Sequence, residues 1–208
     1  MKKLDIGNTS LRISKPLLHS PSRSVIIGFA FLILIGTTLL MLPAASKNHP
    51  IGFINALFTS TSAVCVTGLT VLDTGSVFSG FGKFIILALI QVGGLGIMTL
   101  STLFLLLIRQ RPGLTGQIVI QDTYTHSRER KLTEILKDVV LFTLVIETIG
   151  AIIIFFVFFS EYGTENALIL AVFHSVSAFC NAGFSLFDNS FVGYRENWIL
   201  NITASLLI

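Results

Sequence analysis

The sequence predicts an all-α membrane protein built from two copies of one span–short helix–span unit. Of its 208 residues, 52% are apolar and only 12% are charged, about half the charged share of a soluble domain. The apolar residues gather in runs long enough to cross a bilayer. In addition, the passage FTSTSAVCVTGLTVLD at 58–73 has a counterpart, FHSVSAFCNAGFSLFD, at 173–188.

The first unit covers residues 25–108. Its expected elements are a span, a short helix, an extended segment and a second span, at 25–42, 51–63, 64–72 and 84–108. The first run carries no charge and is about 27 Å long at about 1.5 Å per residue, so it can cross the bilayer core. The short helix cannot cross, so it is re-entrant or interfacial. A turn at 73–76 leads into the second span.

The second unit covers residues 139–208. Its expected elements are a span, a short helix, an extended segment and the start of a last span, at 139–159, 167–179, 180–187 and 198–208. A short acidic loop separates the span from the short helix. The last run stops about half a span in, and a half-crossed helix would leave polar groups in hydrocarbon. We therefore expect this chain to be a piece of a longer protein.

The charge distribution predicts the orientation of the spans. The N-terminal tail at 1–24 holds five basic residues and one acid, the linker at 109–138 holds six basic residues and four acids, and 160–197 holds one basic residue and four acids. Since Lys and Arg concentrate in cytoplasmic segments, we expect a multi-pass plasma-membrane protein with a cytoplasmic N-terminus and a cytoplasmic linker. A cleaved secretory signal is the alternative for the first run, but that run is long for a signal and more spans follow. Nucleic-acid binding would need a polar domain with a basic face, which the composition excludes.

The two units align when the sequence is shifted by 115 residues. Nine of the twenty positions from 54–73 match those from 169–188. The identical pairs are Ile54/Ile169, Ala56/Ala171, Phe58/Phe173, Ser60/Ser175, Ser62/Ser177, Ala63/Ala178, Cys65/Cys180, Gly68/Gly183 and Asp73/Asp188. Both ends of a unit lie on the same side, so the copies are parallel, and parallel repeats surround a central axis.

An extended segment at membrane depth must satisfy its backbone groups with protein, water or ions. A short helix that ends at mid-depth points the negative end of its dipole inward, which favours a cation. The following strand can then turn its carbonyls toward that cation, and Gly68 and Gly183 permit the required backbone angles. The alternative is that each segment is a buried turn, which its recurrence at the same place in both units disfavours.

The motifs SAVCVTGLTVLDT, QVGGLGIM and SAFCNAGFSLFDN resemble the first two repeats of the Trk/Ktr/HKT potassium transporters, nearest to the Ktr-type translocating subunit. The resemblance extends over essentially the whole chain. It implies four span–pore-helix–span repeats around a pseudo-fourfold ion path, of which two are present here. Each repeat of that family supplies one filter strand with a key glycine.

The resemblance also implies the site and the partners. The ion-binding backbone carbonyls would belong to Val66, Thr67, Gly68, Asn181, Ala182 and Gly183. K⁺ would be the transported ion and Na⁺ an activator, and nucleotide would bind only to a partner subunit. The family works as a homodimer in lipid, with a cytosolic nucleotide-binding regulatory ring. The expected function is K⁺ uptake, with a sodium-permeable transporter of the same superfamily as an alternative.

Several other residues in the expected spans and short helices carry predictions of their own. Glu147 is an acid inside a span, which indicates either a gating or buried-charge role or a protonated or hydrogen-bonded packing residue. His174 on the second short helix is expected to be a hydrogen-bonded scaffold residue. Gly93, Gly94 and Gly96 favour close helix packing, with a hinge as the alternative. Cys65 and Cys180 are expected to pack as small apolar side chains behind the segments.

Two other functional classes are alternatives to an ion-conducting transporter. A solute carrier with a broken-helix binding site would need more polar side chains at mid-depth than Thr67, Asn181 and Glu147. A non-transporting assembly protein would not need the doubled segment. No nucleophile, base or phosphate-binding loop is recognisable in the sequence, so we expect no enzyme activity.

Overall fold

The computed structural model describes residues 21–47, 49–109 and 132–208. These residues are predominantly helical and form no β-strand beyond one isolated bridge between Ser46 and Phe78, which confirms the all-α class. Residues 1–20 of the predicted tail and 110–131 of the predicted linker lie outside the described residues, so their cytoplasmic placement stays a prediction.

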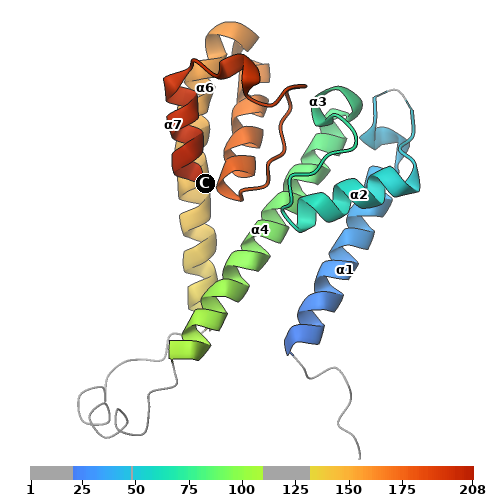
Figure 1. Ribbon diagram of the computed structural model, residues 1–208, viewed down its shortest axis with the longest axis vertical. Coiled ribbons are helices and arrows are strands. Elements are labelled where there is room, and N and C mark those ends of the chain that lie inside the picture. Colours follow the sequence, from blue (N-terminus) through green and yellow to red (C-terminus); the bar gives the residue numbers. More distant parts are fainter. Residues whose placement is uncertain (1–20, 48, 110–131) are drawn as a thin grey trace, which may run out of the picture.

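Two long helices and a shorter one form the first half of the structure. They are α1 (Pro21–Leu40), α2 (Phe53–Val64) and α4 (Gly80–Arg109), with the short elements η2 (Pro43–Ala45) and α3 (Thr74–Val77) between them. Helices α1 and α4 run lengthwise, while α2 lies across them in the upper half and packs against both (Figure 1). Helix α2 therefore ends inside the molecule, next to α4.

The second half is dominated by α6 (Leu132–Phe179), followed by η3 (Val192–Tyr194) and α7 (Trp198–Leu207). The sequence predicts a span and a short helix separated by a loop, and in the structure two helices, both within α6, adjoin directly at one residue. The helix is broken only at Gly163, whose φ is 71° and ψ is 173°. One residue suffices because glycine adopts such angles without a Cβ clash, so the chain reverses there (Figure 1) without the predicted acidic loop.

Two apolar clusters hold these helices together. One joins α1, α2 and α4 around Leu40, Ile86 and Ile90, each fully buried, and extends to Ala182 and Phe184 of the second half. The other lies between α6 and α7, around Ile154, Phe158 and Leu200. Because the first cluster contains residues from both halves, it fixes the position of the second half against α2 and α4.

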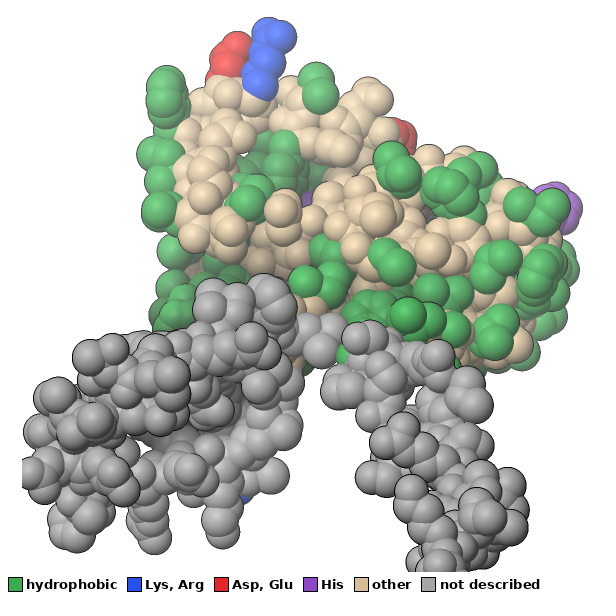
Figure 2. All heavy atoms as spheres, turned by 60° about the horizontal axis from the view of Figure 1, so that its bottom comes forward, with side chains coloured by type: hydrophobic (Ala, Val, Ile, Leu, Met, Phe, Trp, Pro, Cys, Tyr) green, Lys and Arg blue, Asp and Glu red, His purple; other side chains and the backbone are tan. Residues whose placement is uncertain are grey.

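The outer surface of the described helices is apolar. Large side chains such as those of Phe31, Leu141, Phe156 and Leu206 are more than half exposed, and Figure 2 shows hydrophobic side chains over the flanks of the described part. Within the described residues, two helices are long and apolar enough to cross a membrane, at Gly80–Ile97 and Lys137–Phe179. Shorter apolar helices lie at Val25–Leu40, Phe53–Val64 and Trp198–Leu207.

Candidate functional site: two paired glycine segments

Two short segments, each following the end of a helix, have the same backbone conformation. We call residues 65–72, after α2, the first glycine segment and residues 180–187, after α6, the second glycine segment. Both begin with a two-residue turn and continue as irregular backbone of the same length. They run side by side in the centre of the molecule (Figure 1).

Both helices end in the same hydrogen-bonded motif. The N–H of Thr67 donates to the Ser62 carbonyl at 3.0 Å, and the N–H of Ala182 donates to the Ser177 carbonyl at 2.7 Å. In each copy the preceding residue also donates to the carbonyl three residues back. This is the pairing of a Schellman motif, which satisfies carbonyls at a helix end and turns the chain away from the helix axis.

Four residues of the segments have positive φ. The angles are 56° for Val66, 55° for Asn181, 73° for Gly68 and 69° for Gly183. Asn and Gly adopt this region readily, whereas for a β-branched residue it is an outlier. Since such strain is kept where the surrounding structure requires it, the conformation at Val66 is set by its surroundings rather than by its own preference.

The two glycine segments meet at Gly68 and Gly183. A Cβ atom added to Gly68 would lie 2.9 Å from the carbonyl oxygen of Ala182 and 3.2 Å from the Cα of Gly183. A Cβ added to Gly183 would lie 3.0 Å from the Cα of Gly68. The structure therefore brings the predicted site residues of both segments together. Thr67, Asn181 and Gly183 are exposed, and Ala182 is buried against Gly68.

A buried serine on each helix holds the segment that follows it. Ser62 accepts a hydrogen bond from the hydroxyl of Thr67 at 2.9 Å. Its counterpart Ser177 donates to the carbonyl of Phe184 at 2.7 Å. Both serine side chains are buried, each 3% exposed, so a serine hydroxyl left without a partner there would be costly.

Two consecutive glycines of α4 let that helix contact the end of α2 and the start of the second glycine segment. A Cβ on Gly93 would collide with the carbonyl of Val64 at the end of α2, and a Cβ on Gly94 would lie 2.7 Å from the Sγ of Cys180. Gly96 is different, since a Cβ there would make only ordinary contact with the ring of Phe29, at 3.4 Å. The close-packing interpretation therefore fits Gly93 and Gly94. Cys65 and Cys180 are both free thiols, the second one buried.

The same serine–glycine contact fixes both short helices to the preceding span. Ser60 donates to the carbonyl of Ile33 at 2.8 Å, and Ser175 donates to that of Glu147 at 2.7 Å. Each serine lies against a glycine one turn further along the span, Gly36 or Gly150, where a side chain would clash with the hydroxyl. Small residues of this kind are typical of close helix contacts in membranes.

His174 joins the second short helix to the second glycine segment, and the first copy has Thr59 at the corresponding position. Its Nδ1 lies 2.7 Å from the carbonyl of Leu170, and its Nε2 accepts from the N–H of Leu186 at 3.2 Å. The ring also stacks on Phe187, with centroids 4.9 Å apart. These contacts fit a scaffold residue that holds the end of the second glycine segment. Among the described residues, no group of three or more His, Cys, Asp or Glu could hold a metal ion.

Glu147 belongs to α6 and its side chain contacts α4; the residue is 6% exposed. One carboxylate oxygen accepts a hydrogen bond from the amide nitrogen of Gln91 at 3.1 Å. Together with the bond from Ser175 to its backbone carbonyl, this links Glu147 to α4 and to the second part of α6. The sequence indicates Glu147 as a candidate but not its partner, because Gln91 lies 56 residues away on another helix and nothing in the sequence pairs the two.

Asp73 follows the first glycine segment and caps the N-terminus of α3. Its carboxylate accepts from the N–H of Ser76 at 2.7 Å and from the Ser76 hydroxyl, at the start of α3. Partial burial opposes ionisation, but the hydrogen bonds from Ser76 and Gly75 outweigh it and hold the pKa of Asp73 below its ordinary value. The cap therefore carries a negative charge at neutral pH.

Within the described residues, the fold combines an apolar outer surface with two helices long and apolar enough to cross a membrane. A family model described as TrkH, a cation transport protein, matches residues 11–208. The chain belongs to this family, which also places it in a membrane and in a family of transporters.

Individual relatives are named for potassium uptake. The chain is 37% identical over 196 residues to the Ktr system potassium uptake protein B of Bacillus subtilis, covering 94% of this chain and 44% of the relative. It is 38% identical over 190 residues to the potassium/sodium uptake protein NtpJ of Enterococcus hirae, covering 91% of this chain and 42% of the relative. A Ktr system potassium uptake protein B of Vibrio alginolyticus is 37% identical over 183 residues, which are 88% of this chain and 40% of that protein. The chain thus spans less than half the length of these relatives.

Proposed function

We propose that this chain supplies two strands of the selectivity filter of a Trk/Ktr-type potassium uptake protein. The observation that carries the proposal is the meeting of Gly68 and Gly183 on two segments that have positive φ at the same two corresponding positions. The filter carbonyls are those of Val66, Thr67 and Gly68 and of Asn181, Ala182 and Gly183.

The mechanism follows from the ends of the two short helices. Helix α2 and the last part of α6 direct their carbonyl ends toward the start of a glycine segment, and the negative end of a helix dipole stabilises a cation. The carbonyls of the segments replace the water shell of the dehydrated ion. Flow is passive, down the electrochemical gradient, and needs no catalytic side chain.

The complete transporter contains four such repeats around a pseudo-fourfold axis. In this arrangement α2 and the part of α6 after Gly163 are pore helices. The N-terminus and the linker at 109–138 are cytoplasmic, because their basic residues favour that side. The translocating protein is a homodimer, and a cytosolic ring binds the regulatory nucleotide. The Ktr system naming of the relatives supports a system of several components.

A sodium-permeable transporter is the second candidate. Its support is the name of the Enterococcus hirae relative, a potassium/sodium uptake protein. Both visible segments carry glycine, which favours K⁺ as the main ion, and Na⁺ acts as an activator. Comparing K⁺ and Na⁺ uptake under identical conditions separates the two candidates.

Glu147 has a gating or buried-charge role in this proposal, because it links α4 to both parts of α6. Glu147→Gln keeps the shape of the side chain and removes the charge. We expect reduced uptake at unchanged membrane expression. Unaltered uptake would show that the charge is not required.

The filter assignment is tested in cells that lack their own potassium uptake. The gene that encodes this chain should restore growth at low potassium, and Gly68→Ser should lower the K⁺/Na⁺ uptake ratio by about tenfold or more, since the new side chain faces the Ala182 carbonyl. Gly52→Ser is the matched control, because a Cβ at Gly52 meets nothing within 4 Å. An unchanged ratio in Gly68→Ser at normal expression would refute the assignment.

A further inference from the structure

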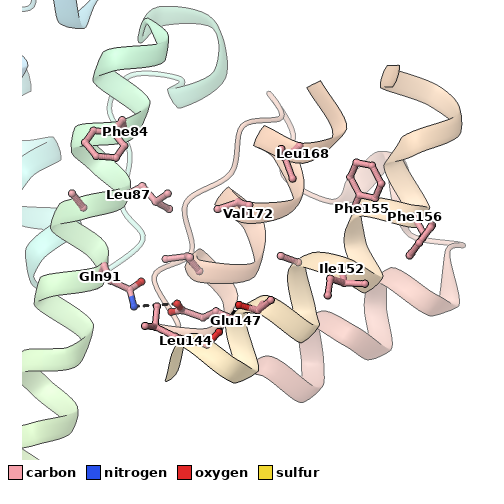
Figure 3. Close-up of a pocket in the computed structure, with 14 residues that line it drawn as sticks. Phe84, Leu87, Gln91, Leu144, Glu147, Ile152, Phe155, Phe156, Leu168 and Val172 are labelled. Carbon is pink, nitrogen blue, oxygen red and sulfur yellow. Dashed lines mark hydrogen bonds between the residues drawn. The ribbon is translucent and has the colours of Figure 1, made fainter. Parts of the chain in front are cut away.

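Two polar side chains, Gln91 on α4 and Glu147 on α6, point toward each other between otherwise apolar helix faces (Figure 3). Their hydrogen bond, from the amide nitrogen of Gln91 to Oε2 of Glu147, joins the two halves of the chain. The remaining oxygen of each group, Oε1 in both residues, is buried and has no hydrogen-bond partner among the described residues. Each side chain therefore uses only one of its two polar ends.

The two unpartnered oxygens define which protonation state of Glu147 fits this arrangement. With Glu147 ionised, both oxygens are acceptors, so neither can bond to the other. A buried acceptor without a donor costs free energy, and a buried carboxylate without a counter-charge costs more. A proton on Oε1 of Glu147 turns that atom into a donor to the amide oxygen of Gln91. One proton then satisfies both atoms and removes the buried charge.

The described residues around Glu147 supply no positive charge to balance a carboxylate. No Lys, Arg or His side chain lines the groove between α4 and α6, and the described sequences of α2 and α7 contain no titratable side chain. Lys83 lies eight residues before the Gln91 position on α4, about 12 Å away along the helix at about 1.5 Å per residue. His174 bonds elsewhere, to the N–H of Leu186. The thiol of Cys180 does interact electrostatically with Glu147, but a thiolate there would oppose a second negative charge.

We propose that Glu147 carries a proton in this conformation and forms a two-bond acid–amide pair with Gln91. The Gln91 N–H donates to Oε2 of Glu147, and the Glu147 O–H donates to the amide oxygen of Gln91. When the pair opens, the O–H bond breaks, the proton passes to water and the electron pair stays on the carboxylate. The join between α4 and α6 therefore depends on one proton.

The acid–amide pair is close to a contact between α4 and the second glycine segment. Gly94 follows Gln91 within one turn of α4 and lies against the side chain of Cys180, so separation of α4 from α6 at the pair changes the packing at that contact. The consequence for transport rests on the proposed filter function. Glu147 gains its charge only when the pair opens, and Glu147→Gln holds the pair closed because an amide offers one donor and one acceptor in the same places.

Infrared spectroscopy of the 208-residue chain in lipid nanodiscs, with isotopically labelled glutamate carboxyl groups, tests the proton directly. At neutral pH we expect the carbonyl-stretching band of a protonated carboxylic acid, which is separate from the bands of carboxylates. Glu147→Gln should remove this band. Gln91→Leu should move it to higher frequency, because the carboxyl group loses its hydrogen-bond partner. Glu165→Gln, at an exposed position, is the matched control and should leave the band unchanged.

The pH dependence of unfolding provides a second measurement. The folded chain holds a proton that the unfolded chain releases above about pH 4.3, the ordinary pKa of a glutamate. Because the folded state binds more protons, its stability falls as the pH rises. Between about pH 5 and pH 8, the unfolding equilibrium constant of the native chain should rise by up to about tenfold per pH unit relative to that of Glu147→Gln.

Three outcomes would overturn the proposal. The first is the absence of a protonated-acid band from the folded native chain, or its survival in Glu147→Gln. The second is an unshifted band in Gln91→Leu, which also keeps the test decisive if Glu147→Gln does not fold. The third is a ratio of unfolding constants that does not change with pH. Failure of the chain to take up K⁺ would instead count against the filter, since neither measurement depends on transport.

Discussion

The α-carbons of Gly68 and Gly183, 115 residues apart in the sequence, face each other so closely that a side chain on either would press on the backbone of the other. Both residues also have a left-handed φ, of 73° and 69°. Two independent requirements, conformation and space, therefore select glycine at each position. The contact predicts how substitutions at the two sites combine.

Gly68→Ala and Gly183→Ala should each lower the free energy of unfolding by about 1–3 kcal/mol, the cost of a strained backbone residue. The double variant should cost less than the sum, because the first methyl group already pushes the segments apart. A double-mutant cycle on thermal unfolding in detergent measures this coupling. Gly80→Ala, where a Cβ meets nothing within 4 Å, is the control, and strict additivity would contradict the contact.

Val66 and Asn181 occupy the same left-handed position with different side chains. Val66→Asn should raise the free energy of unfolding, and Asn181→Val should lower it, each by about 1 kcal/mol, because a β-branched residue is strained there. The opposite signs make the pair its own control. If both changes are destabilising, side-chain packing rather than backbone strain dominates at these positions.

Gly93 and Gly96 on α4 predict contrasting results for the same substitution. Gly93→Ala directs a methyl group at the backbone carbonyl of Val64 and should abolish ion uptake or assembly, since a backbone atom cannot move aside cheaply. Gly96→Ala adds only an ordinary contact with Phe29 and should be tolerated. Uptake normalised to membrane expression provides the measurement. Equal tolerance would show that α4 can shift away from α2 without consequence.

Asp73 predicts a pH dependence of stability. Its pKa is held below the ordinary value in the folded protein, so its contribution is fully present above pH 3.8, the ordinary value, and is lost as the pH falls through the folded pKa. Asp73→Asn keeps a residue that can cap α3 but does not titrate. Its unfolding temperature should therefore fall less steeply than that of the native chain below about pH 4. An equally steep fall in the Asp73→Asn variant would show that Asp73 does not contribute to the acid profile.

The repeated parts of the fold could be predicted from the sequence because identical residues recur at corresponding positions of the two copies. Ser62 and Ser177, like Gly68 and Gly183, occur at one fixed offset, and the structure gives these pairs corresponding positions. The partners of these residues were not accessible. A glycine such as Gly93 indicates that something approaches closely, but only the folded chain shows that it is the carbonyl of Val64.

The break at Gly163 illustrates the second limit. The residues around it, SEYGTEN, are polar and suggest a loop, yet the helix continues on both sides of one glycine. Local composition shows that a segment is polar. It does not show how many residues leave the helical conformation, because that depends on how the flanking helices pack. The same limit applies to Glu147, whose amide partner Gln91 lies on another helix.

The adjacent glycines of α4 place one helix against two points from different halves of the chain, the end of α2 at Val64 and the start of the second glycine segment at Cys180. If α4 tilts or slides, the end of α2 and the thiol of Cys180 are displaced together, since each rests directly on that helix. The distance between the two glycine segments would then change in one concerted motion, driven by α4. A force applied at the far end of α4, near Arg109, would therefore displace both glycine segments at once.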